Sequence, residues 1–214
     1  MASPVLRGVL RVWQVSQAIV LFATPAFAQD VVEIEEHWTL SVGGPDALRS
    51  APQVSMVMSP AGGTDDHFFL VSLNHWSYPD FAAGGVQTQH WHGDTCRSVA
   101  NSPSHQALDT DEETVGWTQR LSLSDGQLVF EVVNGESASW GAFGGDGSLR
   151  VSSPTELSRL NDYKPATSLT ESGIGYAGNR VSSLVLQKLR WRFDGEDDWQ
   201  EMIAPIDIDA DLDP

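Results

Sequence analysis

The chain has 214 residues, a formal charge of −17 at pH 7 and a single cysteine. A surface this acidic repels the phosphates of nucleic acids and of anionic lipids, so we expect neither as a partner. It also keeps a protein soluble in salty surroundings. One cysteine excludes an internal disulfide, and the burial of apolar side chains must therefore stabilise the fold.

Residues 1–28 have the layout of a secretory signal peptide. Arg7 and Arg11 give a positively charged start, residues 12–21 are mostly apolar, and Ala26-Phe27-Ala28 matches an A-x-A cleavage site. The apolar run is shorter than the roughly 20 residues that a membrane span needs. We therefore expect a bacterial protein that is secreted or periplasmic after cleavage following Ala28, with no membrane span in the mature chain.

Alternating apolar and polar residues predict β-strands along most of the remaining chain. Residues 32–40 alternate in this way, and only Glu36 interrupts their apolar face. The pairs Asp125-Gly126 and Asn134-Gly135 tolerate the positive φ of a tight hairpin turn. Further short strands are expected at residues 54–58, 68–74, 86–92, 115–124, 127–133, 137–143, 148–152 and 181–193.

Residues 154–163 are the best helix candidate, with Glu156 in the first turn. Residues 93–113 and 164–178 lack a period, which predicts loops. Many short strands and at most one short helix predict an all-β fold, a single antiparallel β-sandwich of the jelly-roll or lectin-like type over residues 29–205. Residues 206–214 are expected to form an acidic tail.

Two histidines separated by one residue lie near a third. His90 and His92 point to the same side of a strand, because residues i and i+2 share a face. His75 lies at the other end of the preceding loop and approaches them if the two strands pair. Three imidazoles with an open fourth position suit zinc, with Asp94 as a further ligand or a hydrogen-bond partner. Such a pair also occurs by chance, so ordinary strand histidines are the competing interpretation.

Calcium is the second metal ion that the sequence suggests. The alternating aspartates near the end of the chain resemble the start of an oxygen-ligand loop, but the glycine and glutamate that complete such a loop are missing. A solvated acidic tail is the competing interpretation. The four aspartates are Asp207, Asp209, Asp211 and Asp213.

Seven tryptophans follow the signal peptide, and flat aromatic faces stack on sugar rings. Alternation assigns Trp38, Trp117 and Trp191 to the core. On its strand, Trp91 points away from the face that carries Val86 and the two histidines, so a single sheet face does not hold them all. The predicted ligand-binding residues are Asn74, Trp76, Tyr78, Gln87, Gln89, Trp91 and Trp140.

No catalytic constellation stands out. A glycosidase needs two carboxyl groups flanking the scissile bond, and Glu131 and Glu136 are the first pair to test. A polysaccharide lyase needs a base and a cation, for which Tyr176 and Arg180 are candidates. The chain also lacks the G-x-S-x-G sequence of a serine hydrolase.

We therefore predict an exported, non-catalytic domain that binds carbohydrate or a cell-surface partner through exposed aromatic residues. One alternative is a metal-dependent or polysaccharide-cleaving enzyme centred on His75, His90 and His92. Another is a structural extracellular domain without a small-molecule ligand. Zinc and calcium are the only cofactors that the residues suggest.

Overall fold

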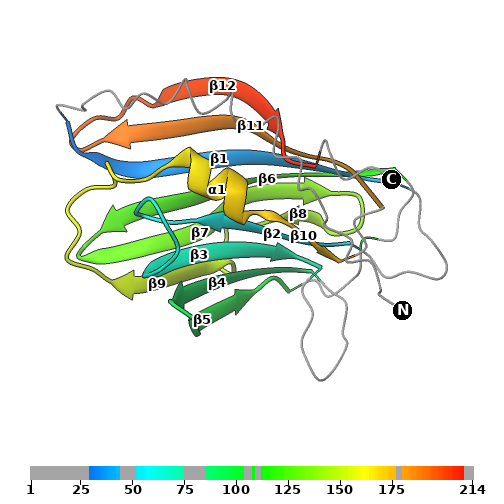
Figure 1. Ribbon diagram of the computed structural model, residues 1–214, viewed down its shortest axis with the longest axis horizontal. Helices are drawn as coiled ribbons and strands as arrows, with labels where there is room; N and C mark the ends of the chain where they lie inside the picture. Colours follow the sequence, from blue (N-terminus) through cyan, green and yellow to red (C-terminus); the bar gives the residue numbers. More distant parts are fainter. Residues whose placement is uncertain are drawn as a thin grey trace, which may run out of the picture.

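Two antiparallel β-sheets pack face to face, and one short helix lies beside them (Figure 1). The computed structural model describes residues 29–43, 52–74, 85–103, 108, 112–176 and 180–209. The all-β sandwich predicted from the alternating patterns is confirmed. Within these ranges, no helix is long and apolar enough to cross a membrane.

The larger sheet has the strand order β12-β11-β1-β6-β7-β8, and β9 also pairs with β7. Its strands are β1 (Val31–Val42), β6 (Glu113–Ser124), β7 (Gln127–Ser137), β8 (Gly141–Phe143), β9 (Arg150–Pro154), β11 (Val181–Phe193) and β12 (Gln200–Asp207). Asp125 and Gly126 form the predicted tight turn between β6 and β7, with φ values of 51° and 71°. Asn134 and Gly135, in contrast, form no turn and lie within β7.

The smaller sheet has the order β10-β2-β3-β4-β5. Its strands are β2 (Gln53–Met58), β3 (His67–Leu73), β4 (Val86–His92), β5 (Thr95–Asn101) and β10 (Gly173–Tyr176). β5 lies where a loop was predicted. It is an edge strand with mostly exposed side chains, including the unpaired Cys96, so backbone pairing with β4 holds it without an apolar pattern.

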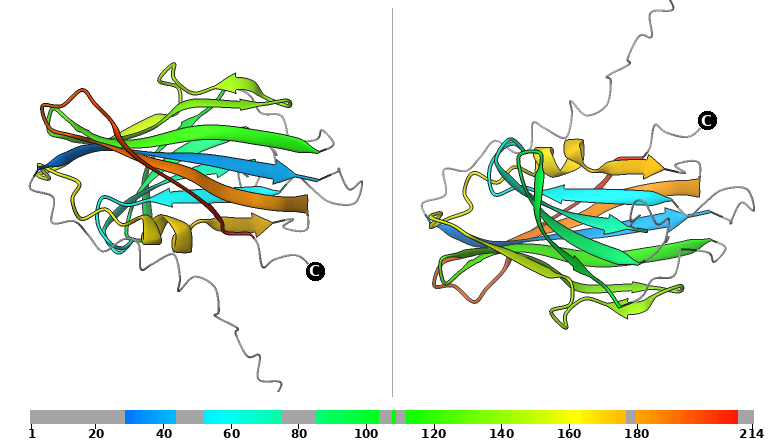
Figure 2. Two further views of the ribbon diagram at one scale, coloured as in Figure 1. Left: turned by 90° about the horizontal axis from the view of Figure 1, so that it is seen from above. Right: turned by 90° about the horizontal axis from the view of Figure 1, so that it is seen from below.

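The helix α1 spans Pro165–Glu171, so the predicted helix at residues 154–163 is wrong. Pro154 instead ends β9, where it pairs with Gln127. Pro165 suits the start of α1 because the first helical residues have no intrahelical partner for their N–H groups. Figure 2 shows the sheets as two layers, with α1 next to β10 at the edge of the smaller one.

β12 continues through Ile206 to Asp207, so the strand includes the first two residues of the predicted acidic tail. The carboxylate of Asp207 accepts hydrogen bonds from the backbone N–H groups of Leu184 and Asp209, at 3.0 Å each. The bond from Leu184 fastens the end of β12 to β11. Residues 210–214 lie outside the described ranges.

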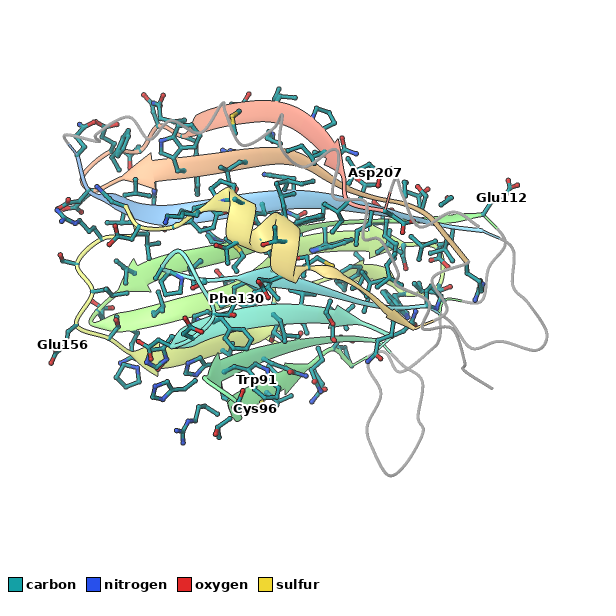
Figure 3. All side chains as sticks on the ribbon, in the orientation of Figure 1. Trp91, Cys96, Glu112, Phe130, Glu156 and Asp207 are labelled. Carbon is teal, nitrogen blue, oxygen red and sulfur yellow. The ribbon has the colours of Figure 1, made fainter. Side chains whose placement is uncertain are left out.

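The core lies between the sheets and is rich in aromatic side chains. Trp38 and Trp117, predicted to face inward, are buried and stack with ring centroids 6.4 Å apart. Trp191 is only partly buried against this core. Phe69 of the smaller sheet stacks on Phe130 of the larger one at 5.4 Å, which joins the two layers. Phe130 is labelled in Figure 3.

Glu36, the residue that interrupts the apolar face of β1, lies fully buried in this core. Its Oε2 atom accepts hydrogen bonds from Trp38 Nε1 and Gln119 Nε2, both at 2.8 Å, and the Tyr163 hydroxyl bonds to Oε1. Burial raises the pKa of Glu36, although hydrogen bonds from Ser168 and the three other side chains oppose it. The interruption in the pattern is therefore a buried polar cluster that links β1, β6 and the segment around α1.

Gly135 is needed because Phe143 occupies the space beside it. A Cβ atom at this position would lie 2.2 Å from Cε2 of Phe143. We expect Gly135→Ala to lower the free energy of unfolding by about 1–3 kcal/mol through overpacking. Gly116, on the neighbouring strand β6, has no atom within 4 Å of the equivalent point, so Gly116→Ala is the matched control. Chemical denaturation checks both, and equal stability of the two variants would contradict the expectation.

Candidate functional site

The hairpin-like pair β3–β4 carries the candidate site. Its register places His67 opposite His92 and Phe68 opposite Trp91. Successive cross-strand pairs face opposite sides of a sheet, so the histidine pair and the aromatic pair lie on different faces. The predicted site residues His75, Trp76 and Tyr78 lie in residues 75–84, outside the described ranges, and the predictions for them stay untested.

The histidines lie on the inner face of the smaller sheet, at the margin of the core. Val86 and His90 are buried at 2% and 3% exposure, and the His90 ring stacks on Phe69 with centroids 4.8 Å apart. His92, two residues further along β4, is exposed. The shared face that alternation predicts for these residues is therefore present, and it runs from the core into solvent.

His67 lies between the other two histidines and was not identified from the sequence. Its Nδ1 atom is 2.9 Å from Nε2 of His90, and its ring stacks on His92 with centroids 4.5 Å apart. Asp66 places Oδ1 at 2.9 Å from Nε2 of His92 and at 3.8 Å from Nε2 of His67. The strand begins one residue before the predicted one, and only the pairing register shows that His67 faces His92.

The pKa of His90 is lowered to about 4, first by burial and then by the nearby charges of His67, His92 and Arg97. His90 is therefore neutral at pH 7, with one protonated and one unprotonated ring nitrogen. In this state its Nε2 atom is able to accept a hydrogen bond from Nδ1 of His67. The cluster thus joins a partly buried hydrogen bond between His90 and His67 to the solvent-exposed side chains of His92 and Asp66.

The outer face of the same strands forms a pocket of about 540 Å³. Phe68 and Trp91 both line this pocket, and their rings stack on each other with centroids 6.0 Å apart and an interplanar angle of 9°. Trp91, labelled in Figure 3, lies on β4 at the exposed margin of the smaller sheet. Thr64, Asp65, Phe68, Leu70, Trp91, Gly93 and Asp94 line the pocket.

A row of side-chain amides holds Trp91 in place. Its Nε1 atom donates to Oε1 of Gln89 at 2.7 Å, and Gln89 in turn donates to Oε1 of Gln87. Gln87 continues the row to Oδ1 of Asn101 at 2.7 Å. Both glutamines are buried. Gln89 orients the indole through its single polar atom. The two glutamines, predicted to bind ligand, are not among the residues that line the pocket.

Two other predicted ligand-binding residues lie apart from the pocket. Asn74 is fully buried, donates from Nδ2 to the carbonyl of Pro52 at 2.7 Å and accepts at Oδ1 from the N–H of Leu108 at 3.1 Å. Trp140 packs against the core and meets Phe143 edge-on at 5.9 Å. Both side chains support the fold at positions where the sequence suggested a ligand platform.

The acidic and basic residues considered for catalysis also lie apart from one another. Glu131 pairs with Arg120 at 3.2 Å on the outer face of the larger sheet, while Glu136 is exposed further along β7. Arg180 is buried and donates to the backbone carbonyls of Leu108 and Gly43. The geometry brings no pair of these groups to a common pocket among the described residues.

No protein-family model and no curated protein matches the chain. It is similar to two solved structures of scytalido-glutamic peptidase. The structure with a transition-state analogue inhibitor has a TM-score of 0.37 and 10% identity, covering 81% of this chain and 82% of that chain. The structure with a peptide-based transition-state analogue has a TM-score of 0.33, with the same identity and coverage. A likeness of this size transfers no activity to this chain.

Proposed function

We propose that the protein is a non-catalytic binding domain that holds a neutral glycan in the pocket lined by Phe68 and Trp91. The observation that carries the proposal is the stacked pair of aromatic rings at a solvent-open pocket, with one ring held by a row of amides. Export, which the signal peptide suggests, matches a ligand found outside the cell.

The pocket has the size and the mixed lining that a sugar requires. Its volume of about 540 Å³ lies within the range of small-molecule sites. Phe68, Leu70 and Trp91 offer apolar surface to the C–H face of a sugar ring, and the indole N–H is already used by Gln89. Because Trp91 is already held in one orientation, its side chain loses little conformational entropy when the ligand binds, which favours affinity.

The polar residues that line the pocket favour neutral sugars over acidic ones. Thr64, Asp65 and Asp94 line the pocket, and the hydroxyl and the two carboxylates suit the hydroxyl groups of a sugar. Two carboxylates in a chain of net charge −17 repel uronic acids and sulfated sugars. A neutral glycan is therefore the ligand that the pocket favours over an acidic one.

We expect Trp91→Ala to weaken the binding of a neutral glycan at least tenfold, which corresponds to about 1.4 kcal/mol. The variant removes the apolar contact and the stacking preference of the indole. Isothermal titration against neutral oligosaccharides that retain the wild-type protein on a glycan panel measures this effect. Trp91→Phe keeps an aromatic face and should lose less.

Trp199→Ala is the matched control. Trp199 lies away from the pocket. The Cζ atom of Arg190 lies over its ring, 4.6 Å from the ring centroid. Its removal should leave glycan affinity unchanged, and circular dichroism confirms that both variants are folded. A wild-type protein that retains no neutral glycan, or equal affinity of wild type and Trp91→Ala, would refute the proposal. Retention of a cell-surface protein by the same pocket would identify the other kind of partner considered from the sequence.

A further inference from the structure

We propose that Asp66, His67 and His92 form a binding site for a divalent transition-metal ion, with zinc as the probe of choice. The site lies on the inner face of the smaller sheet, whereas the glycan pocket lies on its outer face. The proposal therefore stands independently of the proposed function.

Two of the three distances between donor atoms lie near the spacing that a tetrahedral ion requires. Zinc bonds to nitrogen and oxygen at 2.0–2.2 Å, so two ligand atoms around a tetrahedral ion lie roughly 3.3 Å apart. Oδ1 of Asp66 is 2.9 Å from Nε2 of His92 and 3.8 Å from Nε2 of His67, which brackets this spacing. One ligand atom from each of the three residues lies within 4.8 Å of the others.

Rotation of the His67 and His92 side chains is needed before the three residues bind one ion. The His67 and His92 rings are stacked at an interplanar angle of 11°, so both must tilt before their Nε2 lone pairs meet at one ion. Both side chains have room to do so, with exposures of 34% for His67 and 47% for His92. The Asp66 carboxylate, at 75% exposure, is able to follow.

A backbone hydrogen bond from Gly93 and the side chain of His90 hold the three metal-binding residues in position. Gly93 donates its N–H to the carbonyl of Asp66 at 2.9 Å, which ties the loop before β3 to the turn after β4. His90 Nε2 lies 2.9 Å from Nδ1 of His67. A histidine that binds metal through Nε2 carries its proton on Nδ1, and such ligands almost always donate it to an acceptor. His90 is this acceptor and acts as a positioning residue.

The donor set selects the class of ion. Two imidazoles and one carboxylate suit zinc and its neighbours among the transition metals, whereas calcium and magnesium prefer oxygen ligands only. The set contains His67 and Asp66 in place of the predicted His75 and His90. Three protein donors leave a fourth position toward solvent, which a water molecule or a ligand is able to occupy.

Zinc titration of the purified protein, prepared without a polyhistidine tag and stripped with a chelator, tests the site. We expect one equivalent of zinc to bind, and cobalt to give the strong visible absorption of a four-coordinate ion. The double variant His67→Ala/His92→Ala should lose more than about 100-fold in affinity, since even residues behind the ligands cost 10–100-fold. His90→Gln, which keeps an acceptor, should lose less than His90→Leu.

His37→Gln is the matched control, because His37 lies on β1 of the other sheet and bonds to Thr118 at 2.9 Å. It should bind zinc as the wild type does. Circular dichroism and thermal unfolding in the presence of chelator confirm that every variant is folded. Zinc affinity that is equal in the wild type and in the double variant would overturn the proposal, whether both bind tightly or neither binds. Glycan binding by Trp91→Ala is measured separately, so failure of one proposal is distinguished from failure of the other.

Discussion

Phe69→Ala is expected to lower the free energy of unfolding by about 3–5 kcal/mol, the range for removing a buried aromatic ring. Phe69 is fully buried, and its ring stacks on Phe130 of the opposite sheet at 5.4 Å. On its other side it stacks on His90 at 4.8 Å. The variant therefore opens a cavity where the two sheets meet and removes the support behind the histidines.

Chemical denaturation at a fixed pH measures this loss. Phe69→Leu is the control, because it keeps much of the apolar volume and should lose clearly less than the alanine variant. A loss below about 1 kcal/mol for Phe69→Ala would contradict the burial of this ring. The leucine variant should also retain zinc binding if the three proposed metal ligands are correct, because none of them is changed.

Glu36→Gln is expected to change how stability depends on pH. The pKa of Glu36 is raised by burial in the folded protein, so the unfolded chain releases this proton at a lower pH than the folded one. The wild type therefore loses stability as the pH rises from the ordinary value of 4.5 toward the raised pKa. Each pH unit in this window costs about 1.4 kcal/mol at most.

Glutamine at position 36 has no proton to release, so this loss is absent from the variant. Its stability relative to the wild type should become more favourable as the pH rises from 4.5 toward the raised pKa. The side-chain amide retains an oxygen for the donors Trp38 and Gln119 and offers an N–H group to Tyr163. Denaturation curves for both proteins at several pH values measure the difference.

Glu35→Gln is a control of opposite sign on the neighbouring residue. Burial by itself raises the pKa of Glu35, but His37 and the charges of Arg120 and Arg190 outweigh it and hold the pKa below its usual value. The ionised Glu35 therefore stabilises the fold above pH 4.5, and this contribution is lost as the pH falls. The variant should become less favourable relative to the wild type as the pH rises. Equal pH profiles for the two variants would refute at least one of the two assignments.

Much of the fold followed from local patterns. The strands with strict alternation, such as β1 and β6, were predicted within a few residues, because one face of each meets the core and the other does not. The helix was misplaced because α1 is only seven residues long and has no side-chain cap, which leaves little local signal. β5 was missed because an edge strand is held by backbone pairing and not by an apolar face.

The candidate site was predictable only in part. Alternation along β4 correctly separated Trp91 from His90 and His92 onto opposite faces. It gave no reason to include Asp66 and His67, which lie 25 residues or more before His92 in the chain. It also gave no reason to expect the hydrogen bonds that join Trp91 to Gln89 and Gln89 to Gln87.

The sequence by itself determined most of the strands and which of their side chains share a face, because these properties depend on the two-residue repeat of a strand. The tertiary structure decided which faces meet. The register of β3 against β4 brings His67 to His92 and Phe68 to Trp91, and the packing of the two sheets buries Glu36. Pairing between distant segments depends on the whole set of contacts, so no local pattern along the chain specifies it.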